Sequence, residues 1–109
     1  MGQRDHIGEF EQLVLLAILR LKGDAYGMKI RREIEERAGR STSIGALYLT
    51  LDRLQTKGFI TSVLGEATEQ RGGRAKRYFT INPSGREMLR ASLKALHKMS
   101  EGLAIAGVA

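Results

Sequence analysis

Residues 43–60, SIGALYLTLDRLQTKGFI, decide the fold. Ser43 is a residue type that often caps the N-terminus of a helix, and Gly58 suits a helix end. The apolar residues between them follow the spacing of an amphipathic helix: Ile44, Leu47, Tyr48, Leu51 and Leu54. The opposite side is expected to be exposed, small near its start and cationic further along: Gly45, Ala46, Leu49, Thr50, Arg53 and Lys57.

A β-hairpin is predicted directly after this helix. Residues 59–64 (FITSVL) and 78–81 (YFTI) are rich in strand-forming side chains, and Gly72 and Gly73 between them suit a tight turn. The return arm starts with RGGRAKR, residues 71–77, which contains four cations. A solvated loop does not need such a cluster, because like charges repel each other. We therefore expect the hairpin tip to face an anionic partner.

Two helices are expected before this unit and one after it. The first covers residues 10–21 and is almost entirely apolar, whereas the second covers residues 25–38 and is mostly charged. The last helix begins at Asn82-Pro83, a typical N-cap and N1 pair, and runs to about residue 99.

The apolar side chains of the last helix cover roughly 200° of the helical wheel, more than one side of a small domain can bury. Leu89, Leu96 and Leu103 recur at intervals of seven within this arc. Such a stripe predicts self-pairing about a two-fold axis. The residues expected in this dimer interface are Leu13, Leu16, Leu89, Leu93, Leu96, Met99 and Leu103.

Length and composition limit the class of protein. The chain has 109 residues, no cysteine and a formal net charge of +6. It therefore fits one domain without disulfides or Cys-ligated zinc, and its charge favours a polyanionic partner, nucleic acid above all. The apolar run LVLLAIL, residues 13–19, is far shorter than the roughly 20 residues of a membrane span and follows acidic residues. We expect a soluble, cytoplasmic protein with no membrane partner.

Nothing in the sequence predicts an enzyme. His6 and His97 lie far apart, and we find no paired metal-ligand spacing, no nucleophile with a plausible base and no phosphate-binding glycine motif. We expect neither catalytic residues nor a cofactor or metal.

The order of elements predicts a winged helix-turn-helix, mainly α with a small β-hairpin, followed by a C-terminal dimerisation helix. The predicted limits are 8–82 for the DNA-binding domain and 83–104 for the dimerisation helix, with 1–7 and 105–109 as tails. In such a domain the third helix enters the major groove, and the hairpin, or wing, reaches phosphates or the neighbouring minor groove.

Four segments also carry a resemblance to a known family: GEFEQLVLLAIL, DAYGMKIRREIEERAG, SIGALYLTLDRLQTKGFI and RGGRAKRYFTINPSGREML. The chain resembles the PadR-like transcriptional regulators from about residue 8 to residue 88. It is similar to the short form of the family, which has one C-terminal helix. The resemblance implies a homodimeric repressor that binds a palindromic operator. It leaves any small-molecule effector unidentified, and the tryptophan sandwich of certain drug-binding relatives is missing, since this chain has no tryptophan.

The resemblance and the helical pattern together predict the DNA contacts. They are Ser43, Ala46, Tyr48, Leu49, Thr50, Arg53 and Lys57 on the third helix, and Arg71, Gly72, Gly73, Arg74, Lys76 and Arg77 on the wing. Three have a second interpretation: Tyr48 as a core residue, Arg77 as an anchor for the wing, and Leu49 as cover for protein surface. A protein–protein module and a duplex-RNA binder stay open as other functions.

Overall fold

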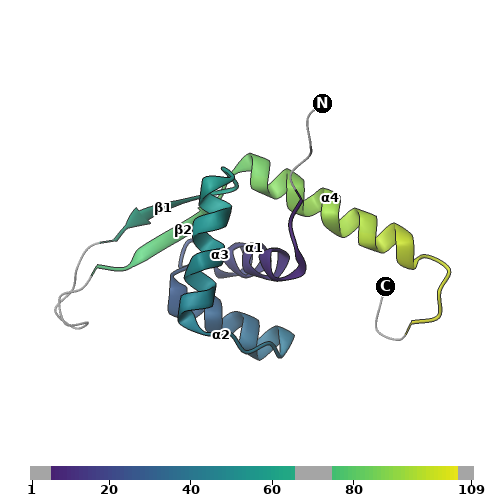
Figure 1. Ribbon diagram of the computed structural model, residues 1–109, viewed down its shortest axis with the longest axis horizontal. Coiled ribbons are helices and arrows are strands. Elements are labelled where there is room, and N and C mark those ends of the chain that lie inside the picture. Colours follow the sequence, from purple (N-terminus) through teal and green to yellow (C-terminus); the bar gives the residue numbers. More distant parts are fainter. Residues whose placement is uncertain (1–5, 66–74, 106–109) are drawn as a thin grey trace.

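The structure is a computed structural model that describes residues 6–65 and 75–105. The described elements are, in chain order, α1 (Glu9–Leu21), α2 (Gly27–Ala38), α3 (Ile44–Thr56), β1 (Ile60–Leu64), β2 (Arg77–Ile81) and α4 (Pro83–Ser100). The two strands form an antiparallel hairpin in which Ile60 pairs with Ile81 and Leu64 with Arg77. This is the predicted winged-helix architecture. Figure 1 shows the hairpin and α4 extending in opposite directions from the body formed by α1, α2 and α3.

The core lies where α1, α2 and α3 meet the base of the hairpin. Its largest fully buried side chains are Val14, Leu15, Ile30, Leu47, Leu51, Leu54 and Ile60. All four helices contribute apolar side chains to this core, and α1 contacts every other helix and β2. Burial of these side chains provides the main favourable contribution to folding.

Two residues correct the predicted boundaries of the core. Ile7 is buried, so the prediction that places it in an N-terminal tail is wrong. Leu89, in the second turn of α4, is 3% exposed and packs in the same core. The prediction that Leu89 belongs to an unpartnered stripe is therefore wrong, because its own chain already covers it.

The start of α2 also differs from the prediction. Residues 25 and 26 are extended, since the carbonyl of Ala25 accepts a hydrogen bond from the Phe79 amide (2.8 Å) and Tyr26 pairs with Tyr78 in an isolated β-bridge. Because residues 25 and 26 pair with β2, they do not belong to the helix, and α2 begins at Gly27.

The beginning of α4 is tied to the turn between α3 and β1. The carbonyl of Gly58 accepts hydrogen bonds from Asn82 Nδ2 (2.9 Å) and Ser84 Oγ (2.8 Å). The Asn82 amide donates to the carbonyl of Phe59 (2.8 Å), and Gly85 packs directly against that carbonyl. We call this set of contacts the α3–α4 joint.

The far end of α4 lies at Ser100, so Leu103 is outside the helix. The predicted seven-residue repeat of Leu89, Leu96 and Leu103 therefore does not form one stripe: the first is buried in the core and the last follows the helix end.

Candidate nucleic-acid interface

The N-terminal half of α3 presents a capped, open helix end. The Oγ of Ser43 accepts a hydrogen bond from the Ala46 amide (3.0 Å), which confirms the predicted cap. Ser43, Gly45 and Ala46 are all exposed. Because their side chains are small, another molecule can approach the helix backbone closely at this end.

The exposed face of α3 is rotated from the predicted one. Thr50 is 6% exposed, and its hydroxyl donates to the carbonyl of Ala46 (3.2 Å). The prediction that Thr50 lies on the outer face is therefore wrong. On the other flank, Ile44 and Tyr48 are each 38% exposed, although the sequence predicts them to face inward.

Lys57 lies in a contact between helices rather than on an open face. Its ammonium donates to the buried carboxylate of Glu11 (Nζ to Oε2, 3.2 Å) and to the carbonyl of His6 (3.1 Å). The other oxygen of Glu11 accepts from the Gly8 amide (2.8 Å). These bonds join the start of α1 to the end of α3, so the prediction that Lys57 lies on the open outer face of the helix is wrong. Arg53, by contrast, is 56% exposed and only loosely paired with Glu11 at 4.0 Å.

A chain of polar contacts connects α3 to the base of the hairpin. Arg77 Nη1 on β2 donates to Ser62 Oγ on β1 (3.1 Å), and Ser62 Oγ donates to Gln55 Oε1 on α3 (3.2 Å). This geometry agrees with the interpretation of Arg77 as an anchor for the wing. The other predicted wing residues, Arg71, Gly72, Gly73 and Arg74, lie outside the described residues.

A basic hollow lies between α2, α3 and the hairpin. It is lined by Tyr26, Gly27, Met28, Arg32, Tyr48, Leu64, Ala75, Lys76 and Arg77, a set with three cations and no acid. The ammonium of Lys76 lies 3.4 Å from the centre of the Tyr26 ring, within the range of a cation–π contact. The Tyr48 hydroxyl lies directly over Gly27, where a Cβ would be 2.4 Å away. Tyr48 thus packs against the protein body while 38% exposed, and its contact with DNA stays a prediction.

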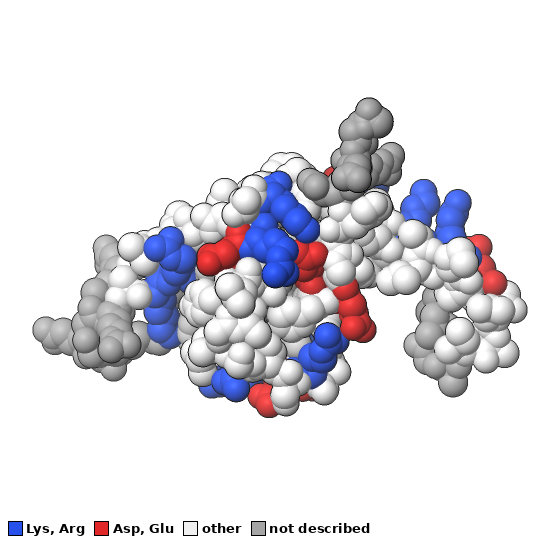
Figure 2. All heavy atoms as spheres, viewed as in Figure 1, with Lys and Arg blue, Asp and Glu red and all other residues white. Residues whose placement is uncertain are grey.

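Charge is distributed unevenly over this side of the molecule. Figure 2 shows Lys and Arg side chains over the hairpin and near one end of α3, with acidic side chains beside them. On the surface of α2, the hydrogen bond to Asp24 raises the pKa of Lys29 above its ordinary value.

Sequence reasoning missed two residues on the exposed face of α3. Asp52 and Thr56 are both exposed and follow Leu49 at three and seven residues, on the same face of the helix. The three buried leucines at positions 47, 51 and 54 place these residues on the opposite side of the helix, but the assignment also requires Thr50 to be buried, which the sequence pattern did not predict.

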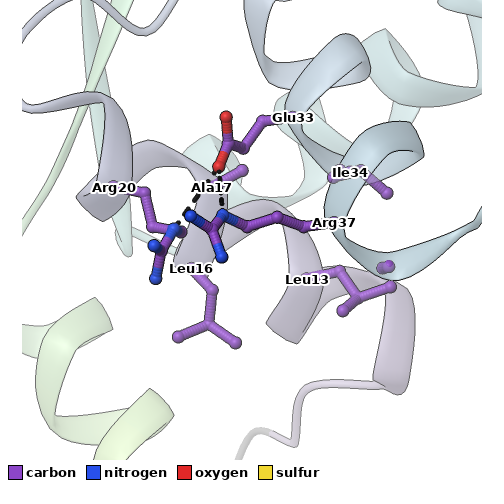
Figure 3. A pocket seen from close by; sticks show the side chains of 8 residues that line it. Leu13, Leu16, Ala17, Arg20, Glu33, Ile34 and Arg37 are labelled. Carbon is purple, nitrogen blue, oxygen red and sulfur yellow. Dashed lines mark hydrogen bonds and ion pairs between the residues drawn. The ribbon is translucent and has the colours of Figure 1, made fainter.

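The surface predicted to form a dimer is divided between α4 and α1. Leu93, Leu96 and Met99 of α4 are 38%, 59% and 79% exposed. Leu13 and Leu16 of α1 are half-buried and line a hollow of about 200 Å³ between α1 and α2. Figure 3 shows Arg20 and Arg37 directed at Glu33 beside this hollow, with Arg–Glu distances of 3.3 and 2.8 Å.

Over residues 6–65 and 75–105, no three His, Asp or Glu side chains are grouped so that they could hold a metal ion. None of the described helices is both long and apolar enough to span a bilayer.

Comparison with known proteins identifies relatives of the whole winged-helix unit. Residues 15–91 match the model of the transcriptional regulator PadR-like family, and no curated protein sequence matches the chain. A PadR family transcription regulator of known structure, from hypervirulent Clostridium difficile R20291, is 25% identical, with a TM-score of 0.65 over 84% of this chain and 91% of the relative.

Two further solved structures are similar. A PadR-like transcription factor from Bacteroides fragilis is 25% identical, with a TM-score of 0.66 over 87% of this chain and 89% of the relative. A PadR-like transcriptional regulator from Bacillus cereus strain ATCC 14579 is 22% identical and shares the fold, with a TM-score of 0.69 over 84% of each chain.

The matched family consists of transcriptional regulators and not of enzymes. The match covers more than half of the residues and includes α2, α3, the hairpin and the start of α4. The chain therefore belongs to the PadR-like family of transcriptional regulators.

Proposed function

We propose that this protein is a homodimeric repressor that binds a palindromic operator in duplex DNA. The observation that carries the proposal is the capped, exposed N-terminal half of α3, with small residues at Ser43, Gly45 and Ala46, next to a projecting hairpin. A helix with this kind of end can enter the major groove, whose width admits one α-helix.

Phosphate contacts fit the surface around that helix. The basic hollow holds Arg32, Lys76 and Arg77 beside the Tyr48 hydroxyl, and no carboxylate lines it. All four groups donate hydrogen bonds and the three cations also carry positive charge, the two properties that the DNA backbone selects. Arg53, exposed on α3, is the described cation best placed to reach a base.

Self-association is supported by the apolar surface of α4. Leu93, Leu96 and Met99 project from a helix that extends away from the body, and exposed apolar strips of this kind favour burial against a partner. The hollow at Leu13 and Leu16 offers a complementary apolar surface. Binding to successive major grooves on one side of DNA would require the two-fold axis to place the two copies of α3 about 34 Å apart.

The test is to sequence the genomic fragments that the full chain retains and then to measure competition. Operator, random duplex DNA and duplex RNA compete for the protein at fixed salt, because affinities depend strongly on ionic strength. We expect the operator to compete at least about 1,000-fold better than random DNA, the usual lower limit for specific binders, and better than RNA. Equal competition by random DNA or RNA would contradict operator recognition, and no competition by any nucleic acid would favour a protein–protein module.

A further inference from the structure

The orientation of α3 identifies the row of side chains that points furthest from the core. Leu47, Thr50, Leu51 and Leu54 are buried. At about 100° per residue, the opposite side of the helix carries Gly45, Leu49, Asp52 and Thr56, and all four are exposed. Leu49, at 65% exposure, is the most exposed large apolar residue of α3. This row contains no cation.

Asp52 is the one ionisable group of this outward row. No cation of the described segments forms an ion pair with it. Its neighbour Arg53 is directed toward Glu11 instead, and Arg77, which lines the same open hollow as Asp52, Gln55 and Thr56, donates to Ser62. The carboxylate is thus left with acceptor capacity on the face that the proposed function turns toward the bases.

We propose that Asp52 determines operator specificity by accepting a hydrogen bond from the N4 amino group of a cytosine in the major groove. This inference rests on the proposed function. An ionised carboxylate can only accept hydrogen bonds, and only cytosine and adenine offer amino donors on that edge. Adenine places its N7 acceptor beside the amino group, where it repels a carboxylate, whereas cytosine has no acceptor there.

Electrostatics makes this contact selective. A carboxylate near the DNA backbone is repelled by phosphates whatever the sequence. A hydrogen bond from cytosine offsets that repulsion at one base only, so Asp52 lowers affinity for every other base at its position. Leu49, one turn earlier in the same row, offers an apolar surface for the methyl group of a neighbouring thymine.

The experiment is selection of binding sites from a random duplex DNA pool by the full-length wild type, Asp52→Asn and Asp52→Ala. Glu36→Gln is the matched control, since it removes one exposed carboxylate from α2. Wild type and control are expected to enrich the same sites, with cytosine at one position of each half-site. Asp52→Asn should select adenine there, because an amide pairs with the N6 and N7 of adenine, and Asp52→Ala should select no base at that position.

Direct binding then measures the size of the effect. Replacing that cytosine should weaken wild-type binding by about tenfold or more and leave Asp52→Ala within about twofold. If both Asp52 variants select the wild-type sites and merely bind all DNA more tightly, Asp52 only adds repulsion and the inference is wrong. If the wild type itself enriches no site, operator recognition fails as well, so the two failures are distinguishable.

Discussion

At the scale of single residues, two glycines inside helices have opposite surroundings. A Cβ built on Gly85 in α4 would lie 2.3 Å from the carbonyl oxygen of Phe59, which is backbone and itself accepts the Asn82 amide. A Cβ on Gly45 in α3 would meet nothing within 4 Å. Alanine at Gly85 therefore tests the energetic cost of a steric clash, whereas alanine at Gly45 tests the gain in helix propensity without a clash.

We predict that Gly85→Ala lowers the free energy of unfolding by about 1–3 kcal/mol, the usual cost of overpacking. Gly45→Ala should raise it by up to about 1 kcal/mol, because alanine favours the helix. Denaturant unfolding of both variants measures the difference. Equal stabilities would show that α4 can shift away from Phe59 without cost.

Arg53 and Lys57 form a second matched pair, one turn apart on α3. We predict that Arg53→Ala weakens operator binding by about 1–3 kcal/mol, as removal of a guanine hydrogen bond would, with little change in stability. Lys57→Ala should instead destabilise the fold, because it leaves the buried carboxylate of Glu11 without its closest cation. Operator titrations and unfolding curves of both variants give the two values, and a reduction of affinity confined to Lys57→Ala would reverse the assignment.

At the scale of elements, sequence predicted where helices begin and end better than how they face. The cap at Ser43 and the proline at the start of α4 are local signals, and both ends lie where they predict. The side of α3 that faces the core includes Thr50, which the sequence pattern placed on the outside. Its hydroxyl donates to the Ala46 carbonyl within the same helix, and this bond allows a polar residue to be buried. The role of Lys57 depends on Glu11, 46 positions away, and no local pattern contains that contact.

The tip of the wing, with Arg71 and Arg74, is the part for which the prediction rests on sequence alone. Replacing Arg71, Arg74 and Lys76 by alanine should weaken binding to operator and random DNA by similar factors. The slope of log affinity against log salt should fall by about 0.9 for each phosphate that the variant no longer neutralises. Salt titrations with both DNAs measure this, and weaker binding limited to the operator would show that the wing contacts bases. Lys76→Ala alone tests the cation that also lies over Tyr26.

At the scale of the whole molecule, we expect the exposed part of α4 to determine the oligomeric state. We predict that Leu93→Glu combined with Leu96→Glu gives a folded monomer that has lost high-affinity operator binding, because two carboxylates cannot be buried unpaired in a dimer interface. Light scattering measures the mass, and wild-type monomers at micromolar concentration would contradict the dimer.

Leu89→Ala is the control for this prediction. Its side chain is 3% exposed in the core of its own chain, so its removal should lower stability by about 2–5 kcal/mol and leave the folded fraction dimeric. A monomeric but equally stable Leu89 variant would mean that this residue belongs to the interface after all.

The α3–α4 joint gives this small protein a mechanical property. Asn82 and Ser84, at the start of α4, both donate to the carbonyl of Gly58 in the turn that follows α3, so we expect the two helices to move together about this joint. Eighteen helical residues make an arm of about 27 Å, and a tilt of about 5° at its base displaces the tip by about 2 Å. In the proposed dimer, a second chain that held the tip of α4 would therefore also restrict the angle of α3. The bonds to one glycine carbonyl would then help to determine how well the two copies of α3 fit a given spacing of grooves.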